Sequence, residues 1–130
     1  YCENATAVAK FLETSDKIVS VTYPGLETDQ YHALAQKYLP NGTCGVISFS
    51  IKGGRPAAVR FMDALELASI EVHVADIRTC VLHPASATHR QLTEEQLVAA
   101  GIDGGLIRLS VGLEHVDDIL ADVKQALDRV

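Results

Sequence analysis

Two kinds of hydrophobic pattern follow one another along the chain. In some stretches apolar and polar residues alternate, which is the two-residue period of a β-strand with one apolar face. Strands are predicted from this alternation at residues 45–51, 70–74 and 106–111, and from β-prone residues at 18–23 and 79–82. Because most of these strands alternate, one face of their sheet is expected to be polar or to meet something outside the core of this chain.

In the remaining stretches apolar residues recur at the three-to-four-residue spacing of a helix. Helices are predicted at residues 4–14, 28–39, 55–65, 93–100 and 116–127. Asn4 is a candidate cap for the first helix, and Thr93 with Gln96 forms a capping box for the fourth. In the last helix, Asp122 is expected on the solvated side, opposite the apolar stripe.

The elements run in the order α-β-α-β-α-β-β-α-β-α, without an internal repeat or a linker. This order predicts a single α+β domain over residues 1–130, an α/β sandwich-like arrangement with an open, largely antiparallel sheet of four or five strands and helices on one side. A parallel sheet covered on both faces is disfavoured, because its strands would be almost continuously apolar.

Composition narrows the class of protein. Hydrophobic residues make up 48% and charged residues 22% of the 130 positions, as in soluble globular proteins. A net charge of −6 with scattered basic residues argues against binding to nucleic acid. No apolar run approaches the roughly 18–20 residues that cross a bilayer, and no secretory signal is visible. We therefore expect a cytoplasmic protein with no nucleic-acid and no membrane partner.

The cysteines and histidines give no sign of a metal or disulfide site. Cys2, Cys44 and Cys80 lie far apart, and three is an odd number. This pattern argues against a disulfide framework and fits a reducing compartment. The histidines also lack the spacing of zinc ligands, so no metal site is expected.

Arg108 is the residue with the clearest chemical potential. It lies in the middle of the strand predicted at 106–111, on the same face as Leu106 and Ser110. A guanidinium is a planar fork that can hold a carboxylate by two parallel hydrogen bonds. In an apolar strand it needs an acidic partner or a ligand. From the residues alone, a solvated or salt-bridged arginine is the simpler interpretation, and ligand binding is the alternative.

Two longer segments resemble one family of enzymes. Residues 83–92, HPASATHRQL, resemble the HPAS-x-TH signature of the Cys/Met-metabolism, or trans-sulfuration, family of pyridoxal-phosphate (PLP) enzymes. Residues 106–114, LIRLSVGLE, resemble that family's RLSVGxE stretch. The shorter segments YPGL, FSIKGG and CENA make the O-acetylhomoserine sulfhydrylases the most similar branch. The two long motifs are specific together, whereas the short ones are weak.

The resemblance implies that this chain is only the small C-terminal, substrate-binding domain of a longer fold-type I enzyme. The upstream domain would carry the lysine that binds PLP covalently; Lys17, in Thr14-Ser15-Asp16-Lys17, resembles that lysine motif only superficially. PLP is therefore expected in the parent enzyme and none on this chain alone. We expect no catalytic and no cofactor-binding residue here, and a chain that is inactive by itself; Tyr1, which is not an initiator methionine, fits a truncated or processed product.

The resemblance also implies which residues contact substrate. The family's carboxylate-binding arginine maps onto Arg108, which would hold the α-carboxylate of the amino-acid substrate. A second contact, usually serine or asparagine, maps onto His73, and Ala75 stands where glycine is common; both are departures from the family. Further candidate contacts lie in the HPAS loop, where a role as loop anchors fits them equally well: Ser86, Thr88 and His89.

The implied reaction of the parent is that of a PLP-dependent transferase. It would replace the acetate of O-acetylhomoserine by sulfide or a thiol and give homocysteine or methionine. The expected partners are the upstream domain of the same polypeptide and a small amino-acid substrate, within a homotetramer. The alternative function is a free-standing α/β module that binds a small ligand or another protein without catalysis.

Overall fold

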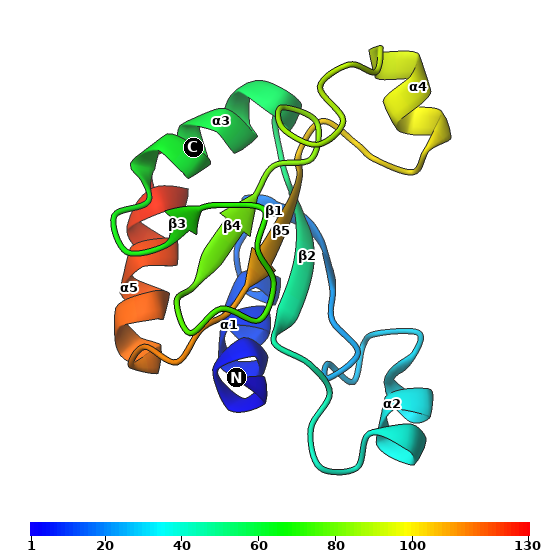
Figure 1. The fold of residues 1–130 in the computed structure, drawn as a ribbon, viewed down its shortest axis with the longest axis vertical. Coiled ribbons are helices and arrows are strands. Elements are labelled where there is room, and N and C mark those ends of the chain that lie inside the picture. The colour runs from blue at the N-terminus through cyan, green and yellow to red at the C-terminus, as the bar shows by residue number, and fades with distance from the viewer.

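The computed structural model describes all residues from 1 to 130, and its centre is a five-stranded sheet in the order β1-β2-β5-β4-β3 (Figure 1). The strands are β1 (Ile18–Thr22), β2 (Val46–Ile51), β3 (Ser69–Ile70), β4 (Cys80–Leu82) and β5 (Leu106–Ser110). The pairings β1–β2, β2–β5 and β4–β5 are antiparallel, and the short edge pair β3–β4 is parallel. The predicted open, largely antiparallel α+β sheet is therefore confirmed.

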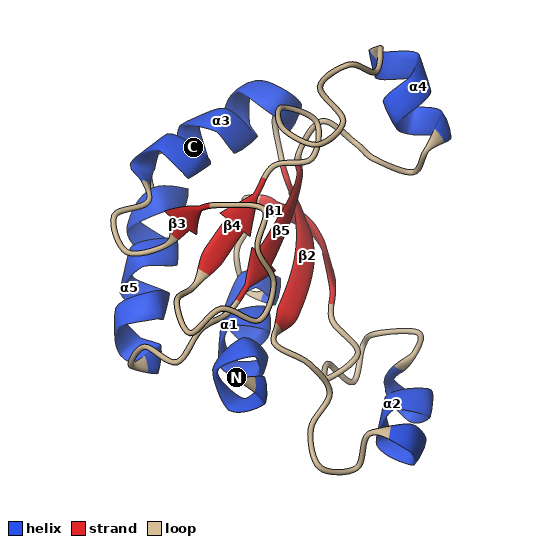
Figure 2. Cartoon of the chain, in the orientation of Figure 1, coloured by secondary structure: helices blue, strands red, loops and turns tan.

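Three helices cover one face of this sheet: α1 (Cys2–Glu13), α3 (Gly54–Ala64) and α5 (Val116–Leu127). The two shorter helices, α2 (His32–Tyr38) and α4 (Glu94–Ala99), project away from the sheet at opposite ends of the molecule (Figure 2). The helices that pack on the sheet therefore lie on one side, as expected. None of the helices is long and apolar enough to span a bilayer.

The core lies between the sheet and these three helices. Ile47 and Phe49 of β2 and Ile107 and Leu109 of β5 are fully buried there. Phe49 packs edge-on against Phe61 of α3, with ring centroids 5.7 Å apart, a geometry that aromatic pairs favour. The intervening residues of the same strands point to the other side of the sheet, because successive side chains of a strand alternate.

We call that other side of the sheet the open face. It carries Ser48, Cys80, Arg108 and Ser110. It is partly covered by the segment 71–78, which connects β3 to β4. The sequence predicts a strand at 70–74, but β3 ends at Ile70. The reason is that the chain leaves the ladder there and turns over the open face, so that Val72 and Val74 alternate without a neighbouring strand.

Three smaller expectations, about Asp122, Asn4 and the start of the second helix, are wrong. Asp122 is buried rather than solvated, and its carboxylate accepts the backbone N–H groups of residues 66–68. Asn4 is no cap, because α1 begins at Cys2; its side chain donates to the carbonyls of Gly112 and Glu114. The helix predicted at 28–39 is shorter than expected, because α2 begins at His32, and the Asp29 carboxylate accepts the N–H groups of residues 23 and 31. The capping box at the start of α4 is present as predicted.

Candidate functional site

Arg108 lies at the centre of the open face. Its register partners are Ser48 of β2 and Leu82 of β4. Nη2 of the guanidinium donates to the carbonyl oxygens of Val72, at 2.7 Å, and His73, at 3.3 Å. The segment 71–78 thus holds the end of the arginine side chain through main-chain atoms, which sequence reasoning did not foresee.

The Arg108 guanidinium still has unused donors. Nε is buried and has no hydrogen-bond partner, and no carboxylate forms an ion pair with this side chain. The interpretation as a salt-bridged arginine is therefore wrong. A buried donor without an acceptor costs free energy of about 1–3 kcal/mol, and a carboxylate bound to the guanidinium would neutralise its charge.

His73 contributes its main chain rather than its side chain to this arrangement. The imidazole is 63% exposed, and its Nδ1 lies 2.7 Å from Oε2 of Glu71. The structure therefore brings the carbonyl of His73 to Arg108 and leaves the ring pointing to Glu71. A neighbouring residue explains the turn: Ala75 has φ +62°, in the left-handed region that favours glycine. The glycine that the resemblance implies at position 75 is the signal that could have predicted this bend.

The HPAS loop leaves the sheet one residue after Leu82, the β4 partner of Arg108. His83 is buried, and Nε2 lies 2.8 Å from the carbonyl of Gly104; because a carbonyl only accepts, this nitrogen carries a proton. Ser86 is exposed and lines a hollow of about 240 Å³ beside His83. Thr88 Oγ1 and His89 Nδ1 lie 2.8 Å from each other. No hydrogen bond joins Arg108 to residues 86, 88 or 89.

The segment 71–78 and the adjacent Cys80 carry a cluster of titratable groups. Hydrogen bonds from Arg78, first from its backbone N–H and then from its side chain, hold the pKa of Asp76 below its ordinary value. Burial raises the pKa of the Cys80 thiol. Ligand atoms of Glu71, Asp76 and Cys80 lie within 4.8 Å of one another. The positive charge in this cluster is already supplied by Arg78, which pairs with Glu71 at 3.1 Å and with Asp76 at 3.5 Å.

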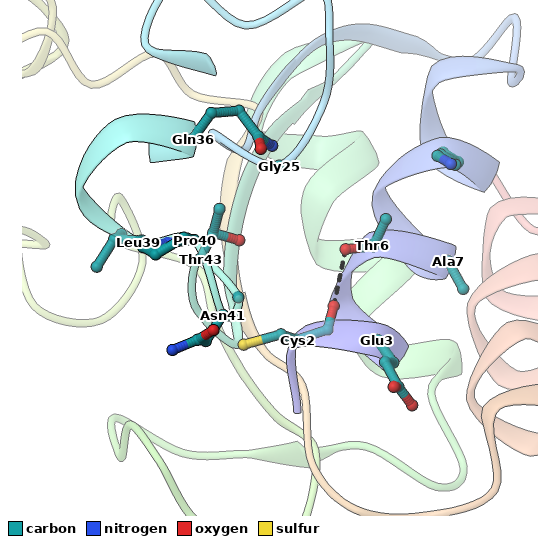
Figure 3. Close-up of a pocket in the computed structure, with 12 residues that line it drawn as sticks. Cys2, Glu3, Thr6, Ala7, Gly25, Gln36, Leu39, Pro40, Asn41 and Thr43 are labelled. Atoms are coloured by element: carbon teal, nitrogen blue, oxygen red, sulfur yellow. Dashed lines mark hydrogen bonds between the residues drawn. The ribbon is translucent and has the colours of Figure 1, made fainter. Parts of the chain in front are cut away.

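A cleft of about 560 Å³ lies elsewhere, between α1 and the turn at residues 39–43 (Figure 3). Cys2, Glu3 and Thr6 line its helical side, and Thr6 donates to the carbonyl of Cys2 at 2.8 Å. None of the predicted site residues contributes to it. Although this cleft is large, it is therefore not the candidate site.

PLP enzymes bind their cofactor through a lysine, and this chain has five lysines. Lys17 donates to main-chain carbonyls near the C-terminus, and Lys124 pairs with Asp128 at 3.2 Å. The ammonium of Lys37 lies over the ring of Tyr38, 5.0 Å from its centroid. Neither these three lysines nor the remaining two, Lys10 and Lys52, line the hollow beside the HPAS loop. The structure thus places Arg108 on the open face without an acidic partner and places none of the five lysines at the hollow beside the HPAS loop.

An open α+β sheet that carries the strand arginine and the HPAS loop agrees with the resemblance to the Cys/Met-metabolism PLP enzymes. Residues 1–128 match the family described as "Cys/Met metabolism PLP-dependent enzyme". The chain therefore belongs to this family, as its two long motifs indicated.

Individual relatives refine the placement. The chain is 48% identical over 128 residues to a homocysteine synthase of Schizosaccharomyces pombe and 47% identical to an O-acetyl-L-homoserine sulfhydrylase of Leptospira meyeri; these matches cover 98% of the chain but only 30% and 29% of those proteins. It is 45% identical to an L-methionine gamma-lyase of Fusobacterium nucleatum subsp. polymorphum, over 100% of the chain and 33% of the relative. The chain thus spans about a third of the length of these relatives.

A solved structure supports the same placement. The crystal structure of a putative O-acetylhomoserine (thiol)-lyase from Campylobacter jejuni matches with a TM-score of 0.89 and 42% identity, over 98% of this chain and 30% of that one. That structure contains a pyridoxyl-lysine phosphate group. The fold of this chain is therefore the fold of one part of a longer PLP enzyme.

Proposed function

We propose that this chain is the C-terminal, substrate-binding domain of a PLP-dependent O-acetylhomoserine sulfhydrylase, in which Arg108 binds the α-carboxylate of the amino-acid substrate. One observation carries the proposal. The Arg108 guanidinium is held on the open face by two main-chain carbonyls, has a buried Nε without an acceptor and has no acidic partner. A carboxylate is the ligand that such a group lacks.

The chemistry would be divided between two parts of the polypeptide. PLP, when bound, supplies the electron sink for the bonds at the α-carbon of the amino acid. Arg108 would fix the orientation of that carbon by binding the carboxylate. Correct orientation alone lowers a reaction barrier by several kcal/mol. Because the resemblance places the PLP-binding lysine in the upstream domain, the 130-residue chain is expected to be inactive by itself and to show no PLP–lysine absorption band when mixed with PLP.

The partners follow from the length of the relatives. The chain covers 29–33% of the relatives named above, which supports an upstream domain as its main partner. We place the parent enzyme in the cytoplasm as a homotetramer. His73, Ser86, Thr88 and His89 remain proposed substrate contacts, reached by closure against the upstream domain rather than within this chain.

The methionine gamma-lyase relative supports a second candidate reaction, elimination from an amino acid instead of replacement. Both reactions use a substrate with an α-carboxylate, so the role of Arg108 is the same in each. Incubation of the full-length parent with O-acetylhomoserine and sulfide, and separately with methionine, distinguishes them: homocysteine as the main product supports the sulfhydrylase, and a 2-oxo acid released from methionine supports the lyase. Turnover by neither route would favour the free-standing binding module.

The test of the carboxylate role is Arg108→Ala in the full-length parent. We expect kcat/KM for O-acetylhomoserine to fall by about 30–1000-fold, corresponding to about 2–4 kcal/mol for a lost charge-assisted contact. Arg60→Ala is the matched control, because Arg60 is exposed on α3 and makes no hydrogen bond or ion pair, and it should leave the constant unchanged. A loss below about threefold for Arg108→Ala would overturn the assignment.

A further inference from the structure

Several residues that follow Arg108 contact the segment that holds its guanidinium. Ser110 is the last residue of β5, and Gly112 and Glu114 follow it two and four residues later. Ser110 Oγ accepts the N–H of Ala75 at 3.1 Å. The N–H of Leu113, between two of these positions, donates to the carbonyl of Ile77 at 2.8 Å. One stretch of chain thus ties down another that is more than thirty residues away.

Glu114 and Thr79 close the far end of the same segment. The Glu114 carboxylate accepts the backbone N–H of Thr79 at 2.6 Å and its hydroxyl at 2.8 Å. The Thr79 hydroxyl in turn accepts the N–H of Gly112 at 3.0 Å, and Thr79 is completely buried. Both hydrogen-bonding capacities of this hydroxyl are therefore used, and the carboxylate makes two of the stronger, charge-assisted bonds.

Gly112 is required by the closeness of the two stretches. A Cβ at this position would lie 2.5 Å from the main-chain carbon of Arg78 and from the carbonyl oxygen of Ile77. No side chain fits there without moving the backbone of the segment. The segment also carries local strain, because Ala75 is held at φ +62°. Strain of this kind persists only where the surroundings determine the conformation, and it tends to occur at functional sites.

We infer that Ser110, Gly112 and Glu114, together with Thr79, are positioning residues that set the location of the Arg108 guanidinium by holding the segment 71–78 in place. The guanidinium has no other anchor than the carbonyls of Val72 and His73. If the segment shifts, the fork shifts with it, and a bidentate contact tolerates little displacement. This inference rests on the proposed role of Arg108 in binding the substrate carboxylate.

The test is a double-mutant cycle in the full-length parent with Glu114→Gln and Arg108→Ala. The glutamine keeps the size of Glu114 but replaces one acceptor oxygen by an amide NH₂, which cannot accept from Thr79. Glu114→Gln alone should lower kcat/KM for O-acetylhomoserine by about tenfold, mainly through KM, and leave the KM for sulfide unchanged. In the Arg108→Ala background the same change should cost less than about twofold, because the group it positions is gone.

The outcomes separate the two ideas. If Arg108→Ala has no effect, the proposed function fails, whatever Glu114→Gln does. If Arg108→Ala has its effect but Glu114→Gln lowers kcat/KM equally in both backgrounds, or in neither, then Glu114 does not act through Arg108 and the inference is overturned. Glu66→Gln is the matched control, since Glu66 is exposed and its side chain makes no hydrogen bond; it should change nothing.

A second variant pair and a structural readout keep the test decisive if Glu114→Gln folds poorly. Thr79→Val removes the hydroxyl at nearly constant volume and should reproduce the KM increase, whereas Thr79→Ser keeps the hydroxyl and should restore the parental KM. In hydrogen exchange measured by mass spectrometry, Thr79→Val should speed exchange in residues 71–78 and leave β2 unchanged. Unchanged exchange in that segment, or a Thr79→Ser variant as impaired as Thr79→Val, would contradict the inference.

Discussion

The two faces of the central sheet come from the same strands but are held by different interactions. On the helix-covered face, Phe49 and Leu109 are fully buried and belong to the hydrophobic core. On the open face, Ser48 and Arg108 are half-buried, and they are register partners across β2 and β5. Burial of apolar surface dominates the first face, and directional hydrogen bonds dominate the second.

This difference explains where stability and function lie. Burial of a large apolar side chain contributes about 1.5–3 kcal/mol and needs no particular orientation beyond good packing. The hydrogen bonds that hold the segment 71–78 contribute less to the net free energy of folding, but they fix atoms to within fractions of an ångström. Substitutions on the helix-covered face should therefore lower stability, and substitutions on the open face should alter substrate binding.

The largest expected effect on stability is that of Phe49→Ala. This change empties a buried site and removes the edge-on contact with Phe61. We expect the free energy of unfolding of the 130-residue chain to fall by about 3–5 kcal/mol, measured by urea denaturation. Ser48→Ala, the adjacent position on the open face, should change it by less than about 0.5 kcal/mol. Similar losses for the two variants would mean that the faces do not differ in this way.

Asp122→Ala should have the next largest effect, because a polar group here stabilises the helix-covered side. Its carboxylate accepts three backbone N–H groups at 2.8–3.1 Å, and the side chain is buried. Removal of the acceptors should cost about 2–3 kcal/mol. The matched control is Asp118→Ala, an exposed position in the first turn of α5, with an expected loss below about 1 kcal/mol. A loss for Asp122→Ala no greater than for this control would show that the three bonds carry no net stability.

Much of the helix-covered face could be predicted from the sequence, because it depends on local periodicity. The alternation of Ile47 and Phe49 with serines, and of Ile107 and Leu109 with Arg108, is enough to identify β2, β5 and their buried sides. The failures have one physical cause. Asp122 and Asn4 were assigned from helical spacing, but their partners lie more than fifty and more than a hundred residues away, and spacing within a helix carries no information about such partners.

The open face was less accessible to prediction. The position of Arg108 on this face follows from alternation, but the covering of its guanidinium by main-chain carbonyls does not, because carbonyl groups are common to all residues. The alternation of Val72 and Val74 wrongly predicted a strand, since the pattern does not show whether a neighbouring strand exists. The glycine that the resemblance implies at position 75 could have indicated the bend, because glycine is favoured at positive φ.

The smallest expected effect is a gain. Ala75→Gly removes the penalty of a left-handed alanine, about 1–2 kcal/mol, and adds the entropic cost of a glycine, about 0.5–1 kcal/mol. The chain should therefore be stabilised by about 0.5 kcal/mol in urea denaturation, with no change in the hydrogen bonds of Arg108. Ala75→Val should do the opposite, because a β-branched residue is more strained at this φ. A destabilised glycine variant would mean that the bend is not strained.

The central claim, that Arg108 recognises the substrate carboxylate, is tested most directly by changing the substrate instead of the enzyme. The measurement is the ratio of kcat/KM for O-acetylhomoserine to that for its α-carboxamide, in the full-length parent and in its Arg108→Ala variant. We expect this ratio of kcat/KM values to be about 30 or more for the parent enzyme and to fall to within about threefold of unity in the variant. An undiminished preference for the carboxylate in the absence of Arg108 would contradict that claim.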